Sequence, residues 1–343
     1  MKVLMISHDP SVFVPGSPAH LRMEAYRAHL DDLRIIVVSG RRGIIRDPKG
    51  FSGFIPDLVT SQDPFEHGVL AWWYARRYGA RLELQVHTDF LSPYFSQSVL
   101  GSVRVFLARI LLGRADCIRV VSERIKKSLI ERSPKLSKRI TVLPLLAKPA
   151  PAHEEIILHV LYPQFSFIYL VASRITKEKN IGMVLSAFAE VLKKHPKAGL
   201  VVVGTGPEEE ALKRRAEKLG LEKSVVFIDW TNSLGSYYKS ADGFLLSSWY
   251  EGYGLTLLEA AHARVPIVTT DVGLVGEILT DAHAFVVPPG DAARFAHAMN
   301  ELLENKALRE AKRARLGALT GIFLDEKEYV EKVVSGWRGC TKR

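Results

Sequence analysis

Two glutamates, Glu251 and Glu259, are separated by seven residues in a stretch that also holds Gly252 and Gly254. An apolar run at 243–246 precedes the stretch and apolar periodicity follows it, which predicts a strand, a turn and a helix. Carboxylates accept hydrogen bonds from hydroxyl groups, and free N–H groups at a helix N-terminus bind phosphate. These groups together suit a ligand that is part phosphate and part polyhydroxyl, such as a nucleotide sugar. The structural alternative is that Glu251 complements the helix dipole and Glu259 is a partly exposed helix residue.

The loop 173–180 is a second candidate, because Arg174 and Lys179 stand just before a predicted helix. Arginine can bind two phosphate oxygens at once and lysine adds a point charge, so the pair could neutralise a diphosphate. A solvated basic loop is the alternative. The Gly-x-Gly at 204–206 lacks the third glycine of a dinucleotide-binding fingerprint, and we interpret it as mainly structural.

In the first half, His87 follows the predicted strand 82–86. At that strand end it could donate to a phosphate or a sugar hydroxyl, or it could be a buried histidine whose hydrogen bonds are satisfied internally. Gly16 lies in a loop with one glycine where a phosphate cradle favours two, which is a weaker signal. No Asp-x-Asp and no Cys/His cluster occurs, so no metal site is predicted.

Strands and helices are expected to alternate along the chain, which is typical of parallel sheets covered by helices. The expected strands are 2–7, 34–38, 82–86, 117–121, 140–143, 167–171, 199–203, 225–228, 243–246 and 267–270. The expected helices are 19–29, 65–78, 99–112 (amphipathic), 181–195, 208–219, 256–263, 292–304 and 326–337. We therefore expect an α/β fold of two doubly wound, Rossmann-like domains, 1–160 and 161–324, facing each other across a cleft. The prolines between 149 and 163 mark the boundary.

The net charge of +10 is concentrated in the first half, where residues 1–160 hold 23 Lys and Arg against 15 Asp and Glu. A basic first domain suits an anionic acceptor, an anionic lipid surface or nucleic acid, and a plain basic surface is the alternative. Only two cysteines occur, Cys117 and Cys340, far apart in the sequence, which argues against a disulfide and for a reducing cytoplasm. No stretch is apolar over a length that spans a bilayer.

These motifs resemble the retaining, GT-B-fold glycosyltransferases of family 4. The specific feature is the Glu-x7-Glu spacing with its Glu-Gly-Tyr-Gly opening, in order with the Arg/Lys loop. The matching stretches of the second domain are 173–180, 201–207, 227–230, 238–242, 247–260 and 265–271. The first domain matches more loosely, at 85–89, 115–116 and 120–122. The loop at 15–18 departs from the family, which usually carries two glycines there.

The resemblance implies that Arg174 and Lys179 hold the donor diphosphate, Glu259 binds the ribose and Glu251 binds the transferred sugar. His87 would lie beside the sugar on the acceptor side, in an acceptor-binding first domain braced by the C-terminal helix at about 325–343. The implied catalytic set is His87, Arg174, Lys179 and Glu251. The implied donor-binding set is Gly16, Arg174, Lys179, Trp230, Leu234, Glu251, Gly252, Tyr253, Gly254, Leu255, Thr256 and Glu259.

The resemblance further implies metal-independent, front-face transfer of a hexose from a nucleoside diphosphate sugar to a glycan or lipid-linked acceptor, with no other cofactor. We expect a cytoplasmic protein, with peripheral contact to an anionic membrane at its inner face. One alternative is a nucleotide-sugar epimerase or hydrolase of the same fold. Another is a non-catalytic basic protein that binds membranes or polyanions. Nucleic acid is not an expected partner, because no aromatic residues cluster among the basic ones.

Overall fold

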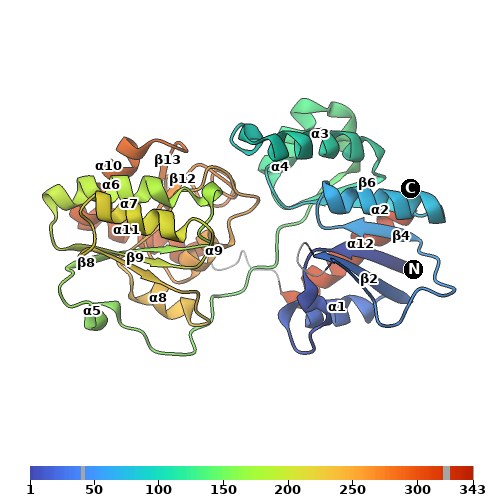
Figure 1. The fold of residues 1–343 in the computed structure, drawn as a ribbon, viewed down its shortest axis with the longest axis horizontal. Coiled ribbons are helices and arrows are strands. Elements are labelled where there is room, and N and C mark those ends of the chain that lie inside the picture. The colour runs from blue at the N-terminus through green and yellow to red at the C-terminus, as the bar shows by residue number, and fades with distance from the viewer. Residues whose placement is uncertain (40–42, 320–324, 343) are drawn as a thin grey trace. The chain divides into compact units, whose positions relative to one another are not determined.

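The computed structural model describes residues 1–39, 43–319 and 325–342, which form two compact α/β units (Figure 1). Unit 1 contains residues 1–146 and the C-terminal helix, and unit 2 begins at Ala147. The division falls before the expected boundary at residue 160, because the proline-containing segment packs on unit 2. There the Gly235 N–H donates to the Pro151 carbonyl at 2.7 Å. Residues 320–324 of the expected second domain and residue 343 lie outside the described residues.

Unit 1 is built on a sheet with the strand order β3-β2-β1-β4-β5-β6-β7, parallel throughout its described residues except between β2 and β3. Helices cover both faces, so the central strands β1, β4 and β5 are buried along almost their whole length. Its strands are β1 (Lys2–Ser7), β2 (Asp32–Ser39), β3 (Gly43–Arg46), β4 (Leu58–Ser61), β5 (Arg81–Val86), β6 (Cys117–Val120) and β7 (Ile140–Val142). Its helices are η1 (Pro10–Phe13), α1 (Pro18–Arg27), α2 (Glu66–Tyr78), η2 (Phe95–Gln97), α3 (Val99–Arg114), α4 (Glu123–Arg132), η3 (Pro134–Arg139) and α12 (Glu326–Thr341).

Unit 2 has a parallel sheet with the order β10-β9-β8-β11-β12-β13, again with helices on both faces. Its strands are β8 (Phe167–Ala172), β9 (Ala198–Val203), β10 (Val225–Ile228), β11 (Gly243–Leu246), β12 (Ile267–Thr270) and β13 (Phe285–Val287). Its helices are α5 (Leu158–Leu161), η4 (Lys177–Lys179), α6 (Ile181–Lys194), α7 (Glu209–Lys218), α8 (Leu234–Ser240), α9 (Leu255–His262), α10 (Ala292–Glu304) and α11 (Lys306–Gly317). The expected α/β class with two Rossmann-like units is confirmed.

The C-terminal helix α12 packs on unit 1, against α1 and the middle of the sheet. Trp337 is fully buried there, and its ring meets Tyr26 edge-on with 5.2 Å between the ring centroids. The last helix of the chain therefore completes the core that the first strand begins.

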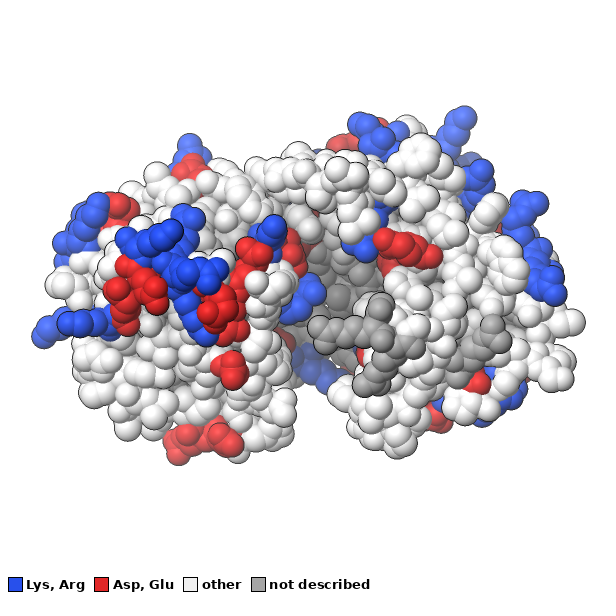
Figure 2. Space-filling view, viewed as in Figure 1, with Lys and Arg blue, Asp and Glu red and all other residues white. Residues whose placement is uncertain are grey.

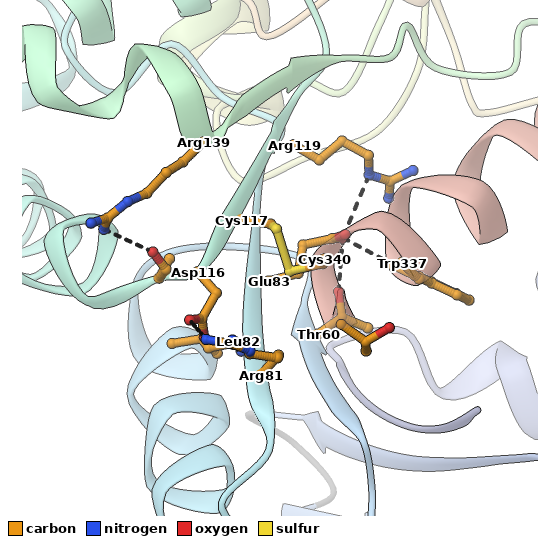
Figure 3. The surroundings of a disulfide bond; sticks show 12 residues. Thr60, Arg81, Leu82, Glu83, Asp116, Cys117, Arg119, Arg139, Trp337 and Cys340 are labelled. Carbon is orange, nitrogen blue, oxygen red and sulfur yellow. Dashed lines mark hydrogen bonds and ion pairs between the residues drawn. A yellow bond between two sulfur atoms is a disulfide. The ribbon is translucent and has the colours of Figure 1, made fainter. Parts of the chain in front are cut away.

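Cys117 of β6 and Cys340 of α12 form a disulfide (Figure 3), so the expectation of unpaired cysteines is wrong. The return of α12 to unit 1 brings the two Cα atoms to 5.9 Å although 223 residues separate them in the sequence. The separation of the two cysteines in the sequence was therefore not evidence against a disulfide. The argument for a reducing compartment rested on unpaired cysteines and loses that support.

On the face of unit 2 drawn in Figure 2, acidic and basic side chains intermingle over α7. Lys213 pairs there with Glu209 at 2.8 Å and with Glu210 at 3.2 Å. Unit 2 is thus nearly balanced in charge at this face. No helix within the described part of the chain has both the length and the apolar character needed to cross a membrane.

Candidate functional site

The two candidate loops of unit 2 meet because their strands are neighbours. The loop 173–180 follows β8, the turn before α9 follows β11, and β8 and β11 pair in parallel, so both loops leave the same edge of the sheet. Lys179 Nζ lies 2.6 Å from Glu251 Oε1, and the two side chains are only 15% and 12% exposed. The candidate cation and the candidate sugar-binding carboxylate thus form one nearly buried ion pair.

Hydrogen bonds to backbone carbonyls hold these two loops together. The Ser247 hydroxyl donates to the Lys179 carbonyl at 2.7 Å, and the Trp249 N–H donates to the Glu178 carbonyl at 2.8 Å. Gly204, after β9, completes the arrangement: its φ is +145°, and a Cβ there would lie 1.9 Å from the Ser173 carbonyl oxygen. A side chain at 204 would displace the loop, which confirms the structural interpretation of this glycine.

The turn between Glu251 and α9 directs the helix N-terminus toward the same loops. Gly254 takes a φ of +90°, which L-residues rarely adopt, and is the N-cap of α9. Gly254 has no side chain, so the N-cap residue makes no side-chain hydrogen bond to this terminus. Ser248 donates to Glu251 Oε1 at 2.7 Å, so the carboxylate is oriented by both Ser248 and Lys179.

Glu259 lies about one turn into α9 in a different environment. The Tyr238 hydroxyl of α8 donates to Glu259 Oε2 at 3.0 Å. Burial raises the pKa of the Glu259 carboxyl, and the Tyr238 hydrogen bond opposes that shift. The sequence assigned no role to Tyr238, because a contact between α8 and α9 has no local signature. Tyr238 engages Oε2, and Oε1 of a carboxylate can also accept a hydrogen bond.

The other predicted donor residues differ widely in exposure. Arg174 is 74% exposed and lies 3.3 Å from Glu178, so it is placed at the rim of the loop. Trp230 is 54% exposed, whereas Leu234 and Tyr253 are each 3% exposed. Leu234 and Tyr253 therefore support the site from the core, and direct side-chain contact with a ligand is available to Arg174 and Trp230. Leu255 is 36% exposed and Thr256 is half-buried, both in the first turn of α9.

In unit 1, His87 lies at the carboxyl end of β5, where its Nε2 is 3.0 Å from Gln85 Oε1. Burial and, next to it, the charge of Arg119 lower the pKa of His87 to about 3. A second histidine, which the sequence did not suggest, lies nearby: His67 of α2 bonds through Nδ1 to Asp63 and through Nε2 to the Val38 carbonyl. The hydrogen bond to Asp63 raises the pKa of His67.

Gly16 lies in the exposed loop before α1, with φ at +79°. The next residue, Ser17, caps α1 by accepting the His20 N–H at 3.1 Å. The loop is therefore explained locally as a helix start.

Both units match family models of known proteins. Residues 161–317 match the model described as "Glycosyl transferases group 1", and residues 7–145 match the "Glycosyl transferase 4-like domain". Among curated proteins, an alpha-monoglucosyldiacylglycerol synthase of Streptococcus pneumoniae is 31% identical over 238 residues, which is 66% of this chain and 54% of that protein. The mannosyltransferase LpsB of Rhizobium meliloti, of lipopolysaccharide core biosynthesis, is 34% identical over 31% of this chain and 32% of that protein. The chain thus spans about half or less of the length of these relatives.

Solved structures agree in fold. Anabaena HepE in complex with UDP-glucose superposes with a TM-score of 0.76 at 17% identity, over 99% of this chain and 100% of that one. The sucrose-phosphate synthase of Thermosynechococcus elongatus gives 0.75 at 18% identity, over 98% of each chain. These likenesses establish the shared fold, and the family models cover each unit in turn. By both of its domains, the chain belongs to the glycosyltransferases of the GT-B fold.

Proposed function

We propose that the protein is a retaining glycosyltransferase that moves a hexose from a nucleoside diphosphate sugar to a glycan or lipid-linked acceptor. The ion pair between Lys179 and Glu251, placed before the N-terminus of α9, carries this proposal. It combines in one place a cation and a helix terminus for phosphate with a carboxylate for sugar hydroxyls. HepE, which shares the fold, binds UDP-glucose.

Unit 2 residues take the negative charge of the leaving group. The Lys179 ammonium has three N–H donors, and the contact with Glu251 engages one of them. The others, with Arg174 and the first N–H groups of α9, stabilise the diphosphate as its bond to the sugar breaks. Glu259, held by Tyr238, accepts the ribose hydroxyls. We propose that these cationic groups act without a metal ion or other cofactor.

Transfer occurs at one face of the sugar. The bond from the anomeric carbon to the phosphate oxygen breaks, and a bond to the acceptor oxygen forms on the same side, through an oxocarbenium-like state. The acceptor hydroxyl proton passes to the departing phosphate oxygen, so no side chain is needed as a general base. We propose that His87 of unit 1 lies beside the sugar on the acceptor side.

The donor assignment is tested by thermal unfolding with UDP, GDP, ADP and their sugar conjugates in the presence of EDTA. A ligand at a hundredfold excess over its dissociation constant stabilises the folded state by about 2.7 kcal/mol. We expect this shift with one nucleotide class, and we expect Glu259→Ala to lose it because the carboxylate that accepts the ribose hydroxyls is gone. Glu217→Ala, an exposed change on α7, is the matched control.

The outcomes separate the alternatives. No shift with any nucleotide, or an unaltered shift in Glu259→Ala, contradicts the proposed donor site. Consumption of the donor without an acceptor, with a free sugar or an epimer as product, favours a hydrolase or epimerase of the same fold.

A lipid-linked acceptor and contact with an anionic membrane are supported by the outer face of α3. The sequence predicts an amphipathic helix at 99–112, but the structure leaves apolar side chains on the solvent side as well. Val99 is 84% exposed and Phe106 is 63% exposed. We call this the α3 patch, and it consists of Val99, Leu100, Val103, Phe106 and Ile110. The opposite side of α3 packs on unit 1 through Val105, Ala108, Leu111 and Leu112.

The charges around the α3 patch complement an anionic bilayer. The helix contains no acidic residue and three arginines, Arg104, Arg109 and Arg114, of which Arg104 pairs with Glu66 of α2 at 2.8 Å. On the neighbouring α2, Trp73 is 51% exposed, and Arg77 lies 5.8 Å from its ring centroid. Exposed apolar residues flanked by arginine and tryptophan are typical of a helix that lies in a membrane interface. The enzyme would then bind a lipid-linked acceptor at the membrane surface in which that acceptor is anchored.

Sedimentation with vesicles tests the α3 patch. Wild type should bind phosphatidylglycerol-containing vesicles and not purely phosphatidylcholine ones. Phe106→Asp should weaken binding at least tenfold, because burial of such a side chain contributes about 1.5–3 kcal/mol. Val160→Asp, at a 71% exposed valine of α5, is the control and should bind as wild type does. A dimer that Phe106→Asp dissociates, without vesicle binding, would assign the patch to a second copy instead.

A further inference from the structure

A chain of polar side chains runs beneath His87 and has no role in the proposed chemistry. Glu83 and Gln85 point to the same face of β5, two residues apart, and His87 follows at the end of that strand. Glu83 and Gln85 are only 3% and 2% exposed. A buried polar group costs free energy unless it has a hydrogen-bond partner. The partners of Glu83 and Gln85 therefore determine how these side chains are oriented.

Arg119 of β6 sets the orientation of the Gln85 amide. Its Nη2 donates to Gln85 Oε1, and its Nε lies 3.9 Å from Glu83 Oε1. A guanidinium group donates and never accepts, so the amide oxygen of Gln85, and not its nitrogen, must face Arg119. The amide nitrogen then points the other way, where it donates to Thr60 Oγ1 at 2.9 Å.

The orientation of Gln85 in turn decides the tautomer of His87. The same Gln85 Oε1 lies 3.0 Å from His87 Nε2, and a hydrogen bond to a carbonyl-type oxygen requires a proton on that nitrogen. A neutral imidazole carries one N–H, so Nδ1 holds the lone pair. We infer that Arg119 and Gln85 are positioning residues, which hold His87 as the Nε2–H tautomer so that Nδ1 accepts a hydrogen bond from a substrate hydroxyl.

The surroundings of His87 keep the ring neutral. Burial and the charge of Arg119 lower the pKa of His87 to about 3, and His8 and Arg22 act in the same direction. Asp63 acts in the opposite direction, but His67 takes its hydrogen bond. The one N–H of His87 already donates to Gln85. This argues against the prediction that His87 donates to a phosphate.

The C-terminal helix contacts these polar side chains at Glu83 (Figure 3). Trp337 of α12 donates its Nε1–H to Glu83 Oε1 at 3.2 Å, and Thr60 donates to the same oxygen at 3.2 Å. Glu83 thus lies between the indole, the hydroxyl and the Arg119 guanidinium. The disulfide fastens α12 to β6 two residues before Arg119. The last helix therefore acts on His87 through Glu83, Arg119 and Gln85.

Nuclear magnetic resonance of the full chain with ¹⁵N-labelled histidine reads the tautomer directly, and the His87→Gln variant identifies the signal. We expect His87 to carry its proton on Nε2 and not to titrate between pH 5 and 9. His67, bonded to two acceptors, is an internal contrast and should be protonated at higher pH than an ordinary histidine. An Nδ1–H tautomer, or a titration of His87 near the ordinary pKa of about 6.5, would overturn the inference.

Two variants test the positioning residues. Gln85→Glu places a carboxylate against Nε2, so His87 should become protonated within the same pH range. Arg119→Met releases the constraint on the Gln85 amide and should give a mixture of tautomers, whereas Arg119→Lys, which keeps a donor cation, should restore the Nε2–H form. An unchanged single tautomer in Arg119→Met would contradict the role of Arg119.

The inference rests on the proposed function only for the identity of the substrate hydroxyl. If that function holds, Gln85→Glu should lower kcat at least tenfold and change the KM of the donor less than twofold, because the donor residues lie in unit 2. The tautomer is measured without substrate. A wrong tautomer therefore overturns this inference, whereas a correct tautomer in an inactive enzyme contradicts the proposed function alone.

Discussion

Glu251→Ala should lower kcat/KM for sugar transfer by about 10- to 150-fold, the equivalent of about 1.5–3 kcal/mol for a hydrogen bond to a charged group. Lys179 and Ser248 both donate to Oε1 of this carboxylate, and in the proposed site the carboxylate accepts hydroxyl groups of the sugar, so its loss should remove those contacts. The substitution also leaves Lys179, only 15% exposed, without its counter-ion. The free energy of unfolding should therefore fall as well, by roughly 1–3 kcal/mol.

A second substitution separates these two effects. Lys179→Met in the Glu251→Ala background removes the unpaired cation, so it should recover stability without recovering activity. Lys213→Met, which removes an exposed partner of Glu209 and Glu210, is the control and should alter stability by less than about 1 kcal/mol. Steady-state kinetics and urea unfolding measure both quantities. Recovery of transfer in the double variant would show that the pair is only structural.

Trp337→Ala should lower the free energy of unfolding of unit 1 by about 3–5 kcal/mol, as expected for a large side chain removed from a core. Trp337 is fully buried, packs edge-on against Tyr26 and donates to Glu83. Trp337→Phe keeps most of the packing but removes the N–H, so it should cost a smaller amount of about 1–3 kcal/mol.

Hydrogen exchange measured by mass spectrometry reports each unit separately, which a single unfolding curve of a two-unit protein does not. Amides of α12 and α1 should lose protection in Trp337→Ala, and those of β8 and β9 should not. Trp73→Ala on α2, half-exposed, is the control and should change stability by less than about 1 kcal/mol. Unaltered protection of α12 in Trp337→Ala would show that the disulfide alone holds the helix.

The sequence alone indicated the α/β class, most long strands and helices, and the strand-turn-helix around Glu251. These features depend on local periodicity and on glycines within a short window, which is the information that a single sequence carries. Three short strands escaped notice: β3, β4 and β13, of three or four residues each. Helices α4, α5, α8 and α11 were also not expected. An element as short as β4 has too few residues to show a period, although it pairs with β1 in the middle of the sheet.

Only the tertiary structure decided which residues meet. Lys179 reaches Glu251 because β8 and β11 are neighbours in the sheet, and Tyr238 reaches Glu259 because α8 lies against α9. Cys117 bonds to Cys340 because α12 crosses back to unit 1. Likewise, periodicity located the helix α3 but did not reveal that its outer face is apolar. Contacts between residues distant in sequence depend on strand order and helix packing, and these follow from how the whole chain buries its apolar surface.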